Sequence, residues 1–135
     1  MPPPRSSPKR PARRDRGACV SPGPEDVKII NLARSALART SARQGACVRD
    51  TDGRSYAGVS VVLQHLNLSA IQVAVAMAVS SGAPGLEAAA LAGEDDPSED
   101  DLALLYELPG TRVVVWNVDA HGAVRSAIEV SGAVR

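Results

Sequence analysis

The chain has 135 residues, the usual size of one domain, and its 15 basic side chains balance its 15 acidic ones. Overall charge therefore points to no one class of partner. Alanine and valine dominate the apolar residues, phenylalanine is absent and aromatic residues make up 2% of the chain, so a core must be built from many small side chains.

Membrane and secreted classes fit the sequence poorly. The longest uncharged apolar run, Leu66 to Ala78, is shorter than the roughly 20 residues that span a bilayer. The N-terminus opens with prolines and arginines instead of a signal-peptide hydrophobic region. Cys19 and Cys47 by themselves form neither a disulfide framework nor a complete zinc site. We therefore expect a cytoplasmic protein with no membrane contact.

The N-terminal segment differs in kind from the rest. Residues 1–16 carry six basic side chains and one acidic side chain, a net charge of +5, and seven of the ten prolines lie within the first 24 residues. Such a segment lacks the apolar surface that would offset the entropy cost of ordering it. We predict a disordered basic tail over residues 1–23, which either contacts nucleic acid or lipid phosphates weakly or serves as a solubilising extension.

The domain is predicted to begin at residue 24 with a helix. Pro24 suits the first turn, Glu25 and Asp26 suit the positive end of the helix dipole, and the apolar spacing continues to about residue 40. A β-hairpin follows, with strands at 46–48 and 56–63 on either side of an Asp- and Gly-rich turn.

The next segment, residues 68–81, is the most apolar in the chain. Its length and alternating alanines favour a helix over a strand, with Ser69 as N-cap and Gly82 as the stop. We expect this helix to be buried on nearly every side. A domain of small side chains covers such a helix poorly, so we expect a homo-oligomer, a dimer or tetramer, formed through helix 68–81.

The C-terminal part alternates strands and a helix. Residues 86–92 read as a buried strand, 97–108 as a helix with an acidic first turn capped near Ser98, and 111–118 and 123–130 as two further strands. The resulting order is α-β-β-α-β-α-β-β, an α/β chain.

Four stretches in this order resemble the cytidine deaminase family. They are Gly45-Ala46-Cys47-Val48, Asp52-Gly53-Arg54-Ser55-Tyr56-Ala57-Gly58, Ala78-Val79-Ser80-Ser81-Gly82, and Pro97 followed by Glu107-Leu108. The resemblance implies a three-layer α/β/α fold with a mixed five-stranded sheet over residues 24–135. It also implies assembly into dimers or tetramers.

The family's reaction depends on zinc, and the resemblance places its three zinc ligands at Ser69, Ser98 and Asp101. In the family a His or Cys opens the central helix and a Pro-Cys-x-x-Cys motif opens the next one, so that the metal activates a water. Serine hydroxyls are poor zinc ligands, and one carboxylate does not make a site. We therefore expect no zinc and no other cofactor.

The other functional positions of the family have also changed. The glutamate that moves the proton corresponds to Ile71, which carries no proton, and the two ribose-binding residues correspond to Ser60 and Val62. The sequence therefore predicts no catalytic residue and no substrate-binding residue at the family's positions.

Few other side chains suggest chemistry. His65, Cys47 and Asp101 are one conceivable unrelated site, although no spacing motif supports it. We expect His121 in a surface turn, Cys19 exposed in the tail, and the acidic stretch 94–101 to be a solvated loop leading into a helix.

The sequence thus favours a non-catalytic cytidine-deaminase-like protein, a pseudoenzyme that acts through homo-oligomerisation or partner binding. Two alternatives stay open at this point. One is a zinc-dependent cytidine or nucleoside deaminase with an atypical site. The other is a nucleic-acid-associated accessory factor whose basic tail supplies the contacts.

Overall fold

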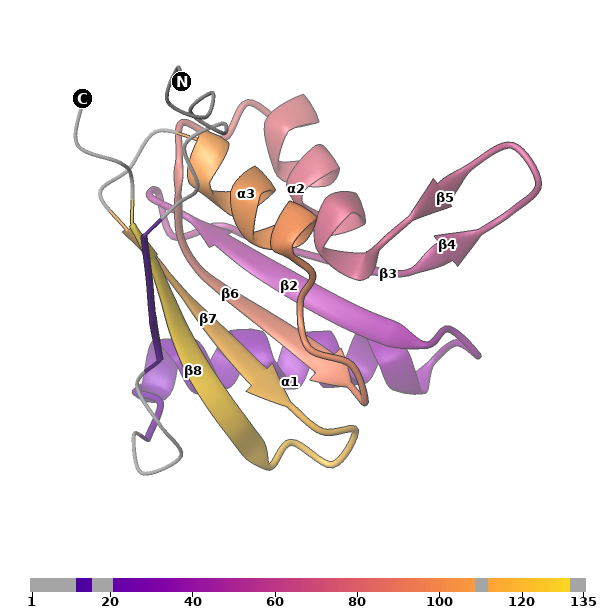
Figure 1. The fold of residues 1–135 in the computed structure, drawn as a ribbon, viewed down its shortest axis with the longest axis horizontal. Coiled ribbons are helices and arrows are strands. Elements are labelled where there is room, and N and C mark those ends of the chain that lie inside the picture. The colour runs from indigo at the N-terminus through magenta and orange to yellow at the C-terminus, as the bar shows by residue number, and fades with distance from the viewer. Residues whose placement is uncertain (1–11, 16–20, 109–111, 132–135) are drawn as a thin grey trace, which may run out of the picture.

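The computed structural model describes residues 12–15, 21–108 and 112–131 and has three layers. One sheet lies between helix α1 on one face and helices α2 and α3 on the other (Figure 1). The helices are α1 (Pro24–Ala38), α2 (Ala70–Ser80) and α3 (Glu99–Glu107). The strands are β1 (Ala12–Asp15), β2 (Gln44–Asp50), β3 (Ser55–Val59), β4 (Val61–Val62), β5 (Asn67–Leu68), β6 (Leu86–Gly93), β7 (Arg112–Val118) and β8 (Val124–Ser131).

The main sheet has the strand order β1-β8-β7-β6-β2-β3. Among the strands that the structure describes, β6 and β7 alone pair in parallel, so the sheet is mixed, as the sequence predicts. The five expected strands and the predicted order of elements are confirmed. A parallel pair needs a crossover connection, and α3 supplies it between β6 and β7.

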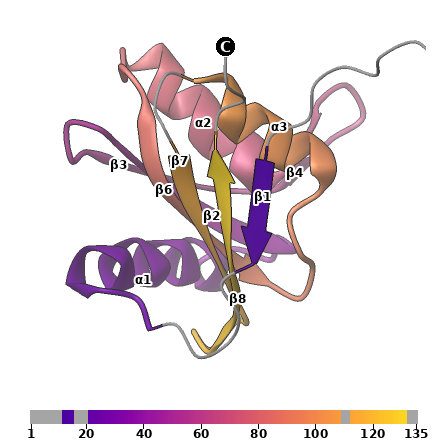
Figure 2. The same cartoon turned by 60° about the vertical axis from the view of Figure 1, so that its left-hand side comes forward.

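A sixth strand corrects the predicted extent of the disordered tail. Residues 12–15 form β1, which pairs antiparallel with β8 at the edge of the sheet (Figure 2). The edge of β8 offers backbone donors and acceptors that a neighbouring segment can pair with whatever its side chains, so composition did not reveal this strand. Of the rest of the predicted tail, residues 21–23 form neither helix nor strand, and residues 1–11 and 16–20, with Cys19, lie outside the described residues.

The core is built mainly from small side chains, as the composition requires. Alanines of β6 alternate between the two faces, and both faces are almost fully buried. Small residues also let α1 approach the sheet closely. A Cβ added at Gly45 would collide with the backbone carbonyl oxygen of Ala33 on α1.

The second hairpin strand is shorter than predicted. β3 ends at Val59, and residues 61–68 leave the sheet as a small β4–β5 hairpin, which we call the arm. The reason is the length of the neighbouring strand β2, which begins at Gln44. The carbonyl of Gln44 accepts a hydrogen bond from the backbone N–H of Ser60, so residues beyond Ser60 have no part of β2 to pair with.

Helix α2 is only partly buried within one chain. Ile71, Ala74, Val75 and Ala78 face the core, but Met77 and Val79 are exposed. One chain therefore covers only one side of this helix.

None of the described helices is both long and apolar enough to cross a membrane.

Candidate functional site

The first turns of α2 and α3 meet at one hydrogen bond. The hydroxyl of Ser69 donates to Oδ1 of Asp101 across 2.6 Å. Because Ser69 precedes α2 and Asp101 lies in the first turn of α3, the bond joins two helix N-termini. Two of the three positions to which the resemblance assigns zinc ligands are thus in direct contact.

Ser69 is also the N-cap of α2, as predicted. Its Oγ accepts a 3.1 Å bond from the backbone N–H of Gln72, and its own N–H donates to Oε1 of Gln72 at 2.9 Å. This is a reciprocal capping box, which satisfies backbone donors that a helix start leaves unpaired.

Ser98 caps α3 in the same way. Its Oγ accepts from the backbone N–H of Asp101 at 3.1 Å, and its N–H donates to Oδ2 of Asp101 at 3.3 Å. Asp101 is 4% exposed, and its two carboxylate oxygens are shared between Ser69 and Ser98. Two positive helix ends beside a buried carboxylate are electrostatically favourable.

This arrangement does not fit a zinc ion. Its donors are two neutral hydroxyls and one carboxylate, and each already serves as a helix cap or accepts hydrogen bonds. Structural and catalytic zinc sites instead use thiolate, imidazole and carboxylate ligands in sets of three or four. Across residues 12–15, 21–108 and 112–131, no group of three or more His, Cys, Asp or Glu side chains is placed to hold a metal.

Three further residues, Ile71, Ser60 and Val62, stand where the resemblance places the family's proton carrier and its ribose-binding residues. Ile71 is fully buried in the apolar cluster beneath α2. The hydroxyl of Ser60 accepts a 3.2 Å bond from the backbone N–H of Gln44, so it supports the strand end. Val62 is 76% exposed on the arm, where it pairs with Asn67. The side chains of Ile71 and Val62 have no polar group, and Ser60 keeps one hydroxyl.

The conceivable site from His65, Cys47 and Asp101 is not formed. Cys47 faces α1, Asp101 lies on α3 at the opposite face of the sheet, and His65 is exposed on the arm. Burial raises the pKa of the Cys47 thiol to about 11, so this thiol is protonated at neutral pH.

The remaining sequence candidates are structural. His121 lies in an exposed turn in which Asp119 accepts backbone hydrogen bonds from His121 and Ala123. The bond from Ala123 is the main cause that lowers the pKa of the Asp119 carboxyl. In the acidic loop, Asp95 pairs with Arg43 at 2.7 Å and Asp96 with Arg125 at 3.8 Å.

A second polar cluster lies on the opposite face, where α1 begins, and sequence reasoning missed it. Arg49 of β2 forms ion pairs with Asp26 and Glu87, each at 2.8 Å. Oδ1 of Asp26 accepts a hydrogen bond from Arg49, and Oδ2 accepts one from the indole N–H of Trp116. Burial alone would lower the pKa of the Arg49 guanidinium, but the hydrogen bonds and negative charges of Glu87 and Asp26 together raise this pKa above its usual range.

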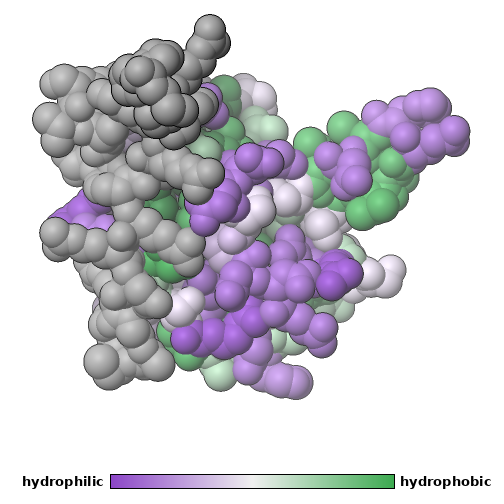
Figure 3. All heavy atoms as spheres, viewed as in Figure 1, coloured by the Kyte–Doolittle hydropathy of each residue, from purple (hydrophilic) through white to green (hydrophobic). Residues whose placement is uncertain are grey.

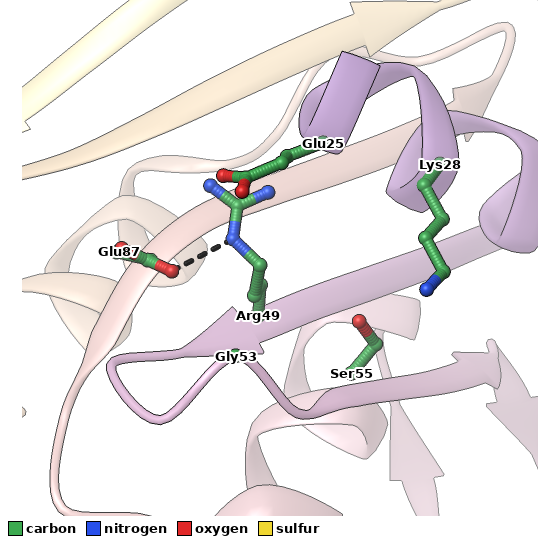
Figure 4. Close-up of a pocket in the computed structure, with 6 residues that line it drawn as sticks. All are labelled: Glu25, Lys28, Arg49, Gly53, Ser55 and Glu87. Carbon is green, nitrogen blue, oxygen red and sulfur yellow. Dashed lines mark hydrogen bonds and ion pairs between the residues drawn. The ribbon is translucent and has the colours of Figure 1, made fainter. Parts of the chain in front are cut away.

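A small cavity of about 160 Å³ adjoins this cluster (Figure 4). Its lining residues are Glu25, Lys28, Arg49, Gly53, Ser55 and Glu87. This volume is below the range of typical ligand pockets, and Arg49 is already engaged by two carboxylates. We therefore interpret the cluster as the anchor of α1 on the sheet.

Comparisons with known proteins agree with the three-layer fold. A family model described as "Cytidine deaminase-like" matches residues 22–122. No match is found among curated proteins.

Solved structures with the same fold include three bacterial cytidine deaminases. That of Mycobacterium leprae is 22% identical, with a TM-score of 0.59, over 73% of this chain and 90% of that one. That of Burkholderia pseudomallei is 23% identical, with a TM-score of 0.61, over 73% and 88%. That of Mycobacterium tuberculosis is 25% identical, with a TM-score of 0.55, over 65% and 80%.

Proposed function

The chain belongs to the cytidine deaminase-like family, and we propose that it is a zinc-free, non-catalytic member that acts through association instead of deamination. The observation that carries this proposal is the hydrogen-bonded set at the junction of α2 and α3. Ser69 and Ser98 cap the two helices, and each of them is hydrogen-bonded to Asp101.

The chemical requirements of deamination are the first argument for a non-catalytic protein. Hydrolytic loss of an amino group at neutral pH needs an activated water and a side chain that moves protons. Here the ligand positions hold hydroxyls and one shared carboxylate, and the proton-carrying position is the buried Ile71. Neither requirement is met at these positions.

Association is supported by the surface of α2. A helix with mostly apolar side chains that leaves Met77 41% and Val79 51% exposed offers surface that a further protein can cover. We propose that the chain forms a homo-oligomer in which this helix takes part.

Native mass spectrometry of the full, untagged chain, together with a cytidine deaminase assay in added zinc, tests the proposal. We expect a metal-free oligomer and no ammonia release from cytidine. One zinc per chain with turnover of cytidine would overturn the proposal. A chain that is strictly monomeric and binds no other protein would also overturn it.

A variant supplies the positive control for metal detection. The three positions converge, so the triple change Ser69→Cys, Ser98→Cys and Asp101→Cys provides three thiolates for a tetrahedral zinc completed by water. We expect this variant to retain about one zinc per chain in the spectrum in which the wild type shows none.

A further inference from the structure

Helix α1 and the strand that follows it carry an excess of positive charge. Residues 27–49 include five basic side chains and no acidic one. Two of the five, Arg43 and Arg49, pair with carboxylates of other segments. The other three belong to α1 or its C-cap and form no ion pair with any residue that the structure describes: Lys28, Arg34 and Arg39.

Arg34 differs from the other two because its side chain is held against the body. Lys28 and Arg39 are exposed, whereas Arg34 is half-buried. A Cβ added at Gly122 would lie 2.8 Å from Cδ of Arg34 and 2.9 Å from its Nε and Nη1. The guanidinium therefore lies against the turn between β7 and β8, in space that is free because residue 122 has no side chain.

The guanidinium of Arg34 is short of acceptors. It carries five N–H donors. Nη1 donates to Oδ1 of Asn31 across a long 3.4 Å, and Nε is buried without a hydrogen-bond partner. The carboxylate of Asp119, in the adjoining turn, instead accepts backbone hydrogen bonds from His121 and Ala123. A partly buried cation without a carboxylate partner favours an anion beside it.

A cavity of about 240 Å³ lies between α1 and this turn. In Figure 3 hydrophilic surface surrounds the turn at the lower edge of the body, in contrast to the apolar surface along the arm. The volume is small for a drug-sized ligand but leaves room for a tetrahedral oxyanion. None of the residues that line the cavity is acidic: Asn31, Arg34, Ser35, Ala38 and Ala120.

We propose that this cavity binds a small tetrahedral oxyanion, either free phosphate or the phosphate group of an ester, through Arg34 and Asn31. A planar guanidinium presents paired donors that match two phosphate oxygens. The amide nitrogen of Asn31 supplies a further donor, since its Oδ1 already accepts from Arg34. The site lies on the face of the sheet opposite α2 and α3, so it does not depend on the proposed function.

Titration of the full chain with inorganic phosphate tests the site. Sodium chloride holds the ionic strength constant, and NMR follows the backbone amides of residues 31–35 and 119–123. We expect saturable shifts of these amides in the wild type. In Arg34→Gln we expect the dissociation constant for phosphate to rise roughly tenfold or more. Arg39→Gln removes the same charge from an exposed residue outside the cavity, so we expect a change of less than about twofold.

Asn31→Asp is a second variant with the same change in net charge. Its carboxylate would stand beside Nη1 of Arg34 and compete with the anion for the guanidinium. We expect it to weaken phosphate binding as much as Arg34→Gln does. Because residue 31 is exposed, this variant keeps the test decisive even if Arg34→Gln does not fold, and thermal unfolding without phosphate confirms the folding of each chain.

Phenyl phosphate separates the two sources of the ligand. Binding of both phenyl phosphate and inorganic phosphate supports a site for the phosphate group of a larger molecule, whereas binding of inorganic phosphate alone supports a site for the free ion. A wild type without saturable shifts at these amides up to about 10 mM phosphate would overturn the inference. Phosphate binding that is unchanged in a folded Arg34→Gln or Asn31→Asp chain would overturn it as well.

Discussion

The Ser69 hydroxyl lies 2.6 Å from Oδ1 of Asp101, and this bond links two reciprocal capping boxes on different helices. It connects residues 32 positions apart in the chain. The first turns of α2 and α3 are therefore tied directly, through side chains that are themselves held by backbone N–H groups.

We expect Ser69→Ala to lower the free energy of unfolding by about 2 kcal/mol. Loss of an N-cap costs about 1 kcal/mol, and a buried carboxylate oxygen left without its donor adds a similar amount. Urea unfolding of Ser69→Ala, Asp101→Ala and the double variant measures the coupling, which we expect at about 1–2 kcal/mol. Ser35→Ala, at an exposed serine of α1, is the matched control. Strict additivity of the two changes would contradict the direct tie.

Cys47 should make stability depend on alkaline pH. The pKa of its buried thiol is about 11 in the folded protein, against 9.0 when unperturbed. Between these values the unfolded chain loses the proton first, so the free energy of unfolding falls as pH rises from 9 to 11, by about 2–3 kcal/mol in total. Below pH 9 this contribution is fully present.

Urea unfolding at pH 8, 9.5 and 11, in a Cys19→Ser background, measures this dependence. Cys47→Ala in the same background is the control, because it removes the titrating group while leaving the other alkaline titrations in place. A difference between the two chains that does not change with pH would refute the assignment to Cys47.

Two glycines should respond differently to the same substitution. A Cβ at Gly58 would lie 2.6 Å from Cγ1 of Val73 on α2, whereas a Cβ at Gly45 would meet the backbone of Ala33. We expect Gly58→Ala to cost about 1–3 kcal/mol and to be partly relieved by Val73→Ala. Gly45→Ala should cost more, because a backbone carbonyl cannot be shortened. Thermal unfolding of the single and double variants checks both expectations, and a Val73→Ala change that gives Gly58→Ala no relief would argue against this contact.

Asp26 should anchor α1 on the sheet. Its carboxylate accepts the 2.9 Å bond from the indole of Trp116, which is 2% exposed, and pairs with Arg49. Asp26→Ala leaves both donors without this acceptor, so we expect a loss of about 2–3 kcal/mol. Trp116 is the only tryptophan and reports unfolding by fluorescence. Glu25→Ala, an exposed acid in the same helix turn, should change stability by less than about 0.5 kcal/mol.

Local signals explain why much of the fold could be predicted from the sequence. Ser69 and Ser98 were identified as N-caps because a cap depends on residues within one helical turn. The order of helices and strands follows from periodicity within each segment, and it matched the structure. The changes at Ile71 and Asp101 were visible as well, because they depend only on alignment to the family's motifs.

Contacts between distant segments could not be read in this way. The bond from Ser69 to Asp101 exists only because β6 and the loop after it bring α3 beside α2. Val62 leaves the sheet because β2 begins no earlier than Gln44, and the segment 12–15 becomes a strand because β8 offers it an edge. Residue type and spacing therefore determined the elements and the residue types at the positions that correspond to the family's motifs. The path of the chain decided which side chains meet and which apolar surface stays exposed, because those outcomes depend on distances between residues far apart in sequence.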